Sequence, residues 1–173
     1  QSEYWVDIYE LELFFNVPTL SKRHKFEKLT TLYRGTFLDG LEKVGGAEFS
    51  RWQTQCQRSF EERVAGTLQE LAENCLQTKD FVLGFQITHW WLTLQPGNEL
   101  AHRLRMLLFW HNKQRTAALL QYNICSEYLQ LHHRLEPSEA TRQLCLQIQK
   151  DDMRFASNKV SLPVAEQTQR RHN

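Results

Sequence analysis

Apolar residues recur every three or four positions along most of this chain, which is the spacing of one buried face of an α-helix. The longest such run starts at Phe49 and predicts a single long helix, with Gly66 as the candidate point for a kink. Its predicted inward positions are Phe49, Trp52, Cys56, Phe60, Val64, Leu68, Leu71 and Cys75. No stretch alternates apolar and polar residues between hairpin turns, so the sequence predicts an all-α fold.

Two shorter helices are predicted before this run. The first starts at a pair with capping-box spacing, Asp7 and Glu10, and ends at Pro18. The second runs from about Thr19 to Tyr33. Gly35 follows it, where a glycine adopts a left-handed conformation at little cost.

Four helices are predicted after the long one. The first ends before Pro96 and Gly97, and Asn98 is placed to cap the second. The second is apolar around so much of its surface that two neighbouring elements must cover it. The third starts near Arg115 and the fourth near Ser138. The predicted inward positions are, in chain order, Leu83, Ile87, Trp90, Trp91 and Leu94; Leu100, Leu104, Leu107 and Leu108, widened by Met106, Phe109 and Trp110; Ala118, Tyr122, Cys125 and Leu129; and Thr141, Leu144, Cys145 and Ile148.

The chain contains an internal repeat. A shift of 34 residues, the tetratricopeptide period, places small or apolar residues on apolar ones. The matched pairs are Ala72 with Met106, Cys75 with Phe109, Leu76 with Trp110, Gly84 with Ala118, Trp90 with Ile124, Trp91 with Cys125 and Leu94 with Tyr128. In such repeats neighbouring helix pairs stack because neither pair can bury its apolar side alone. We therefore expect a right-handed array of antiparallel helix pairs over residues 19–150, preceded by a short helix within 1–18 and followed by a polar linker or tail over 151–173.

Composition and charge exclude several function classes. With 173 residues, 41% of them hydrophobic, the chain can bury one good core. The net charge of +1 gives no overall basic excess of the kind that indicates nucleic-acid binding. No apolar run approaches the roughly 20 residues of a membrane span, so we expect a soluble, cytoplasmic protein without a membrane partner.

One local run of positive charge is a candidate phosphate contact. It lies on the second predicted helix and at its end, with Glu27 as its one opposing charge. Its members are Lys22, Arg23, Lys25, Lys28 and Arg34. The alternative is that these residues form a solvated helix face.

Residues with catalytic or metal-binding potential do not form a complete motif. Glu99 and His102 have the E-x-x-H spacing of di-iron bundles, but the sequence holds no second copy. Phosphate-binding glycine loops and nucleophile motifs are absent from the sequence. Four widely spaced cysteines are expected to be buried thiols: Cys56, Cys75, Cys125 and Cys145. We therefore expect no catalysis, no cofactor and no metal.

Some polar and aromatic residues admit more than one role. Glu99 and Arg103 are spaced for a surface ion pair, and a buried role with Arg58 is the alternative. The adjacent His132 and His133 face different directions on a helix, so they are expected to titrate as turn residues rather than to share a metal. A last group can line a peptide groove, although aromatic residues on doubly covered helices are mostly core. This group is Trp90, Trp91, Phe109 and Trp110.

Three segments, read together, resemble a known family. They are LYRGTFLDGL followed by Trp52 and Arg58, then LQPGNELAHRLRMLL, and finally AALLQYNICSEYLQLHHRLEPSEATRQLCLQI. Their order and spacing are similar to those of the bacterial transcriptional activator domain found in Streptomyces-antibiotic-regulatory-protein-type regulators. The residues that match the family motifs are Tyr33, Gly35, Phe37, Leu38, Gly40, Trp52, Arg58, Pro96, Glu99, Arg103, Met106, Tyr122, Pro137 and Thr141.

The resemblance implies a domain that follows a winged-helix DNA-binding domain and forms a tetratricopeptide-like array. Residues 1–18 would then be the junction helix between the two. Four local departures from the family pattern are visible. Gln95 replaces an acidic residue, Gly84 replaces the repeat's alanine, Lys113 stands near an expected glycine, and residues 132–134 occupy a leucine-glycine type turn. For the glycine-bracketed turn we expect Phe37 and Leu38 to plug the end of the array near Phe49 and Trp52.

The function implied by the resemblance is that of a non-enzymatic interaction domain. Its expected partners are a second copy, the attached DNA-binding domain and RNA polymerase, with DNA reached through the upstream domain. A tetratricopeptide adaptor that binds peptides without a transcriptional role is the main alternative, and a cryptic metal enzyme is the third.

Overall fold

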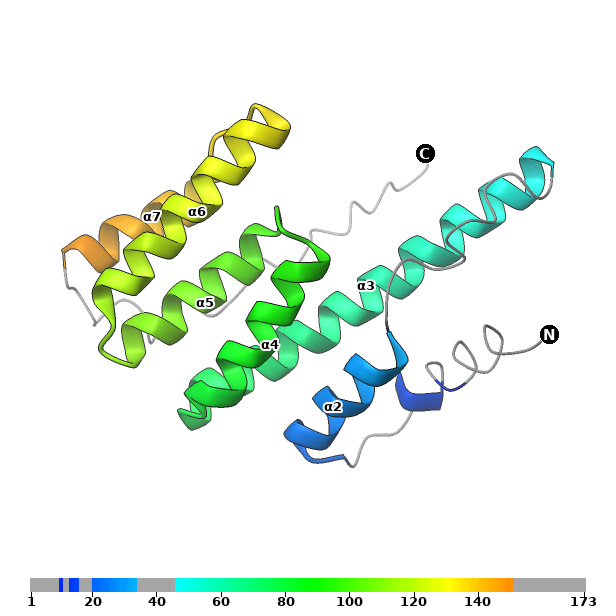
Figure 1. Ribbon diagram of the computed structural model, residues 1–173, viewed down its shortest axis with the longest axis horizontal. Coiled ribbons are helices and arrows are strands. Elements are labelled where there is room, and N and C mark those ends of the chain that lie inside the picture. Colours follow the sequence, from blue (N-terminus) through cyan, green and yellow to red (C-terminus); the bar gives the residue numbers. More distant parts are fainter. Residues whose placement is uncertain (1–9, 11–12, 16–19, 34–45, 151–173) are drawn as a thin grey trace, which may run out of the picture.

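The computed structural model describes residues 10, 13–15, 20–33 and 46–150, and these residues form an all-α structure (Figure 1). No strand occurs among them. Besides the short helical pieces at residues 10 and 13–15, the helices are α2 (Lys22–Leu32), α3 (Ala47–Thr78), α4 (Phe81–Leu94), α5 (Glu99–His111), α6 (Arg115–His133) and α7 (Glu139–Gln149). The predicted all-α class is confirmed, and each predicted helix from residue 19 onward is present with its ends close to the expected positions.

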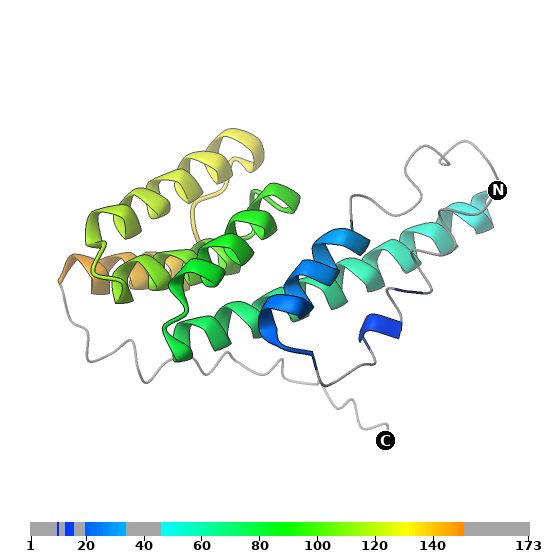
Figure 2. The same ribbon diagram turned by 60° about the horizontal axis from the view of Figure 1, so that its bottom comes forward.

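The helices stack as antiparallel pairs. α3 packs against α4, α4 against α5, and α5 against α6, while α7 contacts both α5 and α6. α2 lies beside α3 in both views, at the opposite end of the stack from α7 (Figures 1 and 2). The predicted tetratricopeptide-like array is therefore present.

The repeat is visible in the backbone as well as in the side chains. Lys79 and Lys113 lie 34 residues apart, end α3 and α5 respectively, and both have a left-handed conformation, with φ of 58° and 62°. After each, a backbone N–H bonds a carbonyl five residues earlier, from Asp80 to Cys75 and from Gln114 to Phe109. Both turns are thus Schellman motifs, in which the left-handed position is most often occupied by glycine. The family's glycine near position 113 therefore reflects a left-handed backbone conformation, which Lys113 adopts in this chain.

Buried side chains form two clusters, each of which joins several helices. The first joins α2, α3, α4 and the start of α5, and includes Leu29, Leu68, Ile87 and Trp91. The second joins the end of α5 to α6 and α7 through Met106, Trp110, Ala118, Leu144, Cys145 and Ile148. The prediction that the Met106 face of its helix is covered from two sides is confirmed, because Met106 is fully buried and Trp110 is 2% exposed.

Gly84 explains one departure from the repeat pattern. A Cβ at this position would lie 2.7 Å from Leu108 Cδ2 and 3.3 Å from the Cβ of Cys75. The missing side chain therefore allows α4 to approach α5 and α3 closely. The glycine that stands in place of the repeat's alanine thus leaves room for the side chain of Leu108 on α5.

The predicted inward face of the long helix is wrong at Trp52. This side chain is 48% exposed, whereas Gln53 is 7% exposed. A helix turns by about 100° per residue, so Gln53 lies within about 20° of Phe60 and Trp52 lies about 80° away. The inward face of α3 follows Gln53, Phe60 and Val64. The predicted plug cannot be compared with it, because Phe37 and Leu38 lie outside the described residues.

Candidate functional site

The carboxylate of Glu99, at the start of α5, joins α5 to the start of α7. Its Oε2 accepts hydrogen bonds from the backbone N–H of Ser138 at 2.8 Å, the Ser138 hydroxyl at 2.7 Å and the Thr141 hydroxyl at 2.5 Å. Arg103 donates to the same Thr141 oxygen at 3.0 Å. Ser138 is the N-cap residue of α7 but makes no side-chain cap to its own helix. Glu99 therefore supplies the negative group that a helix N-terminus favours.

Electrostatics agree with this arrangement. Burial alone would raise the pKa of Glu99, but the hydrogen bonds from Thr141 and Ser138 and the nearby charge of Arg103 lower it overall. Burial also lowers the pKa of Arg103, and the charge of Glu99 opposes that change. An arginine remains protonated in any case, so the junction holds one negative and one positive group.

The expected roles of these charged residues need correction. Glu99 does not form a simple surface ion pair with Arg103, because Thr141 lies between them and bonds both. The alternative with Arg58 is also wrong, since Arg58 is exposed and pairs with Glu62 at 3.1 Å on its own helix. The structure does bring together four motif residues from two distant segments: Glu99, Arg103, Thr141 and the buried Pro137.

His102 takes part in the packing of the repeat. Its Nε2 lies 2.9 Å from the carbonyl oxygen of Pro96, and its Nδ1 lies 2.6 Å from Nε2 of Gln121 on α6. A neutral ring that donates to Pro96 and accepts from Gln121 satisfies both contacts. Burial lowers the pKa of His102, which favours that neutral form. Within the described residues no group of three or more metal-ligating side chains is assembled.

The predicted basic run is only partly free to meet phosphate. Lys22 donates to the Thr78 hydroxyl at 2.7 Å, and Lys25 pairs with Glu70 at 3.3 Å, so both fasten α2 to α3. Arg23 and Lys28 are exposed. Arg34 lies outside the described residues. Phosphate contact by this run stays a prediction.

The aromatic residues that were candidates for a peptide groove are mostly core. Trp91 is 1% exposed and Trp110 is 2% exposed. Trp90 is partly buried, and Phe26 and Tyr33 of the α2 region meet it edge-on at 6.0 and 6.3 Å between ring centroids. Phe109 pairs with Phe85 at 4.6 Å.

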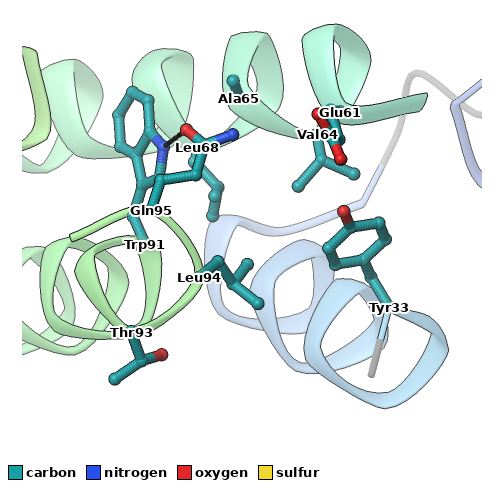
Figure 3. Close-up of a pocket in the computed structure, with 9 residues that line it drawn as sticks. All are labelled: Tyr33, Glu61, Val64, Ala65, Leu68, Trp91, Thr93, Leu94 and Gln95. Atoms are coloured by element: carbon teal, nitrogen blue, oxygen red, sulfur yellow. Dashed lines mark hydrogen bonds between the residues drawn. The ribbon is translucent and has the colours of Figure 1, made fainter. Parts of the chain in front are cut away.

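A groove of about 430 Å³ lies where α2, α3 and α4 meet (Figure 3). Tyr33 comes from the end of α2, four residues come from α3, and the rest come from the last turn of α4 and Gln95. The α3 residues are Glu61, Val64, Ala65 and Leu68. Trp91 Nε1 donates to Gln95 Oε1 at 3.1 Å and fixes that wall. Burial raises the pKa of Tyr33, and the charge of Glu61 raises it further.

An apolar stripe covers the outer face of α6. Leu120, Ile124 and Leu131 are 58%, 47% and 78% exposed. At 100° per residue these three positions fall within about 40° of one another around the helix. The exposed Glu127 lies between Ile124 and Leu131 along the helix, so one charge interrupts the stripe. Exposed apolar patches are typical of protein contact sites.

The remaining motif residues differ in how deeply they are buried. Met106 is buried, Tyr33 and Tyr122 are partly buried, and Pro96 is exposed in the turn between α4 and α5. Gly35, Phe37, Leu38 and Gly40 lie outside the described residues. Their family roles stay predictions.

Sequence analysis missed Glu61 and the α6 stripe. Glu61 gave no signal beyond its adjacency to Glu62, because the groove depends on how α2 packs against α3. The stripe had a detectable signal, since Leu120, Ile124 and Leu131 follow a helical period on the face opposite Cys125 and Leu129.

No described helix is both long enough and apolar enough to cross a membrane. A family model described as the bacterial transcriptional activator domain matches residues 21–149. No curated protein and no solved structure matches the chain. The family match covers the helices from α2 to α7, and the family is regulatory rather than catalytic.

Proposed function

Because the chain belongs to the bacterial transcriptional activator domain family, we propose that it is the protein-interaction domain of a cytoplasmic transcriptional activator. It mediates self-association or contact with the attached DNA-binding domain and RNA polymerase. DNA is reached through an upstream winged-helix domain. The domain itself, residues 19–150, serves as the scaffold for these contacts.

The apolar stripe on α6 is the observation that carries this proposal. Exposed apolar patches on soluble proteins mark contact sites, and Leu120, Ile124 and Leu131 place three large aliphatic side chains on one side of α6. The stripe lies on the helix that packs against α5 through its opposite face, so a partner can approach without disturbing the core. The buried faces of α4 and α5 offer no comparable surface.

The position of α2 supports a second contact. α2 is the first described helix of the array, and it lies at the end of the stack where an upstream domain would join (Figure 2). Its exposed Arg23 and Lys28 are free to meet an acidic partner surface or a phosphate beside the bound operator.

Sedimentation velocity of three proteins tests the proposal. Wild type, Leu131→Glu and the neighbouring control Gln130→Glu are compared, each alone and with the separately expressed upstream domain. We expect a concentration-dependent larger species for wild type and Gln130→Glu, and its loss for Leu131→Glu, because a buried unpaired carboxylate opposes association. Monomers under every condition would count against the proposal.

A further inference from the structure

The groove between α2, α3 and α4 has a chemistry that the proposed function does not use. Five of the nine residues that line it are apolar, namely Val64, Ala65, Leu68, Trp91 and Leu94. Val64, Leu68 and Trp91 are almost fully buried, so polar atoms contribute slightly more of the exposed lining than apolar atoms do. Its volume of about 430 Å³ lies in the range typical of small-molecule sites. The side chains that line it come from three helices, so an occupant would touch all three (Figure 3).

Glu61 gives this groove a negative charge. Its Oε1 accepts a hydrogen bond from Gln57 at 2.8 Å, and within the described part of the chain Oε2 has no hydrogen-bond or ion-pair partner. None of the nine residues that line the groove carries a positive charge. Among the described residues that line it, the groove thus combines five apolar side chains with one carboxylate that has no cationic partner.

Tyr33 and Gln95 complete the polar part. The Tyr33 hydroxyl is directed toward Glu61 across the groove (Figure 3). A cation between these two groups could therefore donate hydrogen bonds to both the carboxylate and the phenolic oxygen. Gln95 Oε1 already accepts from Trp91 and from Asn98 at 2.7 Å, so Gln95 serves mainly as a fixed wall.

We propose that this groove binds a small organic cation, an amine or guanidine carried on an apolar body. The cation pairs with Glu61 and lies beside the hydroxyl of Tyr33. The apolar part lies against Ala65 and Leu94, the two partly exposed aliphatic residues of the lining. A neutral or anionic ligand of the same shape lacks the pairing with Glu61 and binds more weakly.

Binding would also affect the position of α2. In the described residues α2 is held to the rest of the array by a few contacts, among them the Phe26 and Tyr33 rings on Trp90 and the two lysine contacts to α3. A ligand that bridges Tyr33 to α3 and α4 stabilises that arrangement by mass action. The groove is therefore a place where a small effector can act on the end of the array nearest the upstream domain.

The test uses three probes that share one apolar phenylbutyl group: 4-phenylbutylamine, 4-phenylbutanol and 5-phenylpentanoate. Each is titrated into the ¹⁵N-labelled chain, and the amide shifts of Ala65 and Leu94 are followed. We expect saturable shifts at both amides and an affinity for the amine at least tenfold higher than for the alcohol, with the carboxylate weakest. Shifts that do not saturate, or equal affinity for all three probes, would overturn the proposal.

Two variants of nearly unchanged shape assign the charge preference. Glu61→Gln keeps the acceptor for Gln57 but removes the charge, so the preference for amine over alcohol should fall to within about twofold. Glu62→Gln is the matched control, because Glu62 is exposed and pairs with Arg58 outside the groove. An unchanged preference in Glu61→Gln, or an equal loss in Glu62→Gln, would refute the assignment. Cation binding does not depend on protein association, so these results and the sedimentation results can fail separately.

Discussion

At the scale of single residues, Glu99 shows how one side chain fixes two helices. It begins α5 and at the same time accepts hydrogen bonds from the first residues of α7. Arg115, at the start of α6, donates to the carbonyls of Ile148 and Gln149 at the other end of α7. A negative group at the N-terminus and a positive group at the C-terminus both agree with the helix dipole. The last helix is therefore held at its two ends by side chains from the helices that it covers.

Replacing Glu99 by glutamine should lower the free energy of unfolding by about 1 to 3 kcal/mol, since hydrogen bonds to a charged group are replaced by weaker ones. The folded-state pKa of Glu99 is lowered, so its contribution is present above the unfolded pKa near 4.3 and is lost as pH falls through the folded value. Chemical denaturation at several pH values measures both effects. The difference between wild type and Glu99→Gln should be largest above about pH 5 and shrink below it.

Glu127→Gln is the control for this comparison, because Glu127 is exposed on α6 and should change stability by less than about 0.5 kcal/mol. A difference between wild type and Glu99→Gln that does not vary between neutral and acid pH would contradict the role given to the ionised carboxylate.

Lys113 gives a second prediction at this scale. It has a φ of 62°, a conformation that costs a non-glycine residue about 1 kcal/mol. Lys113→Gly should therefore raise the free energy of unfolding by about 0.5 to 1 kcal/mol. Lys113→Ala removes the same charge but keeps the strain, and should give no such gain. Equal melting temperatures for the two variants would show that the backbone is not strained at this turn.

At the scale of elements, α2 is the helix that depends most on a few contacts. Trp90 of α4 receives Phe26 and Tyr33 edge-on. Trp90 matches Ile124 in the repeat, and Ile124 is 47% exposed on α6. The same repeat position is thus covered by α2 in the first helix pair and exposed in the second.

Removing the Trp90 ring should release α2 without unfolding the array. In Trp90→Ala we expect amide hydrogen exchange in α2 to accelerate at least tenfold, because local opening then costs less free energy. Exchange in α6, which has its own core with α5 and α7, should change little. A uniform acceleration over all helices would instead show that α2 opens only with the whole domain.

The positions of the helices were easier to predict from the sequence than the side of each helix that is buried. The breaks at Pro96 and Gly97 and the cap at Asn98 are local signals, and the structure has helix ends there. Trp52 was misplaced because an apolar side chain at helical spacing does not reveal which neighbours reach that far along α3. The junction of Glu99 with Ser138 was also beyond sequence reasoning, since it joins residues 39 apart through a fold that had first to be known.

At the scale of the whole molecule, the described helices form a stack that buries their apolar faces and leaves two surface features exposed. Consecutive helices bury their apolar faces against one another, and the described residues contain no cluster of metal ligands. What remains at the surface is an acid-lined groove near α2 and an apolar stripe on α6. The stripe lies outside the two cores, so variants there can alter contacts while leaving the stack intact, whereas the groove is walled in part by core residues such as Leu68 and Trp91.

Transcription in vitro by the parent activator tests the central claim most directly. Transcript yield is measured at saturating occupancy of an operator that the parent protein binds, for wild type, Leu131→Glu and Gln130→Glu. We predict that Leu131→Glu lowers the yield at least fivefold while Gln130→Glu matches wild type, because only the first places a charge in the apolar stripe. Wild-type yield from Leu131→Glu would contradict the claim that this face of the array makes the protein contact on which activation depends.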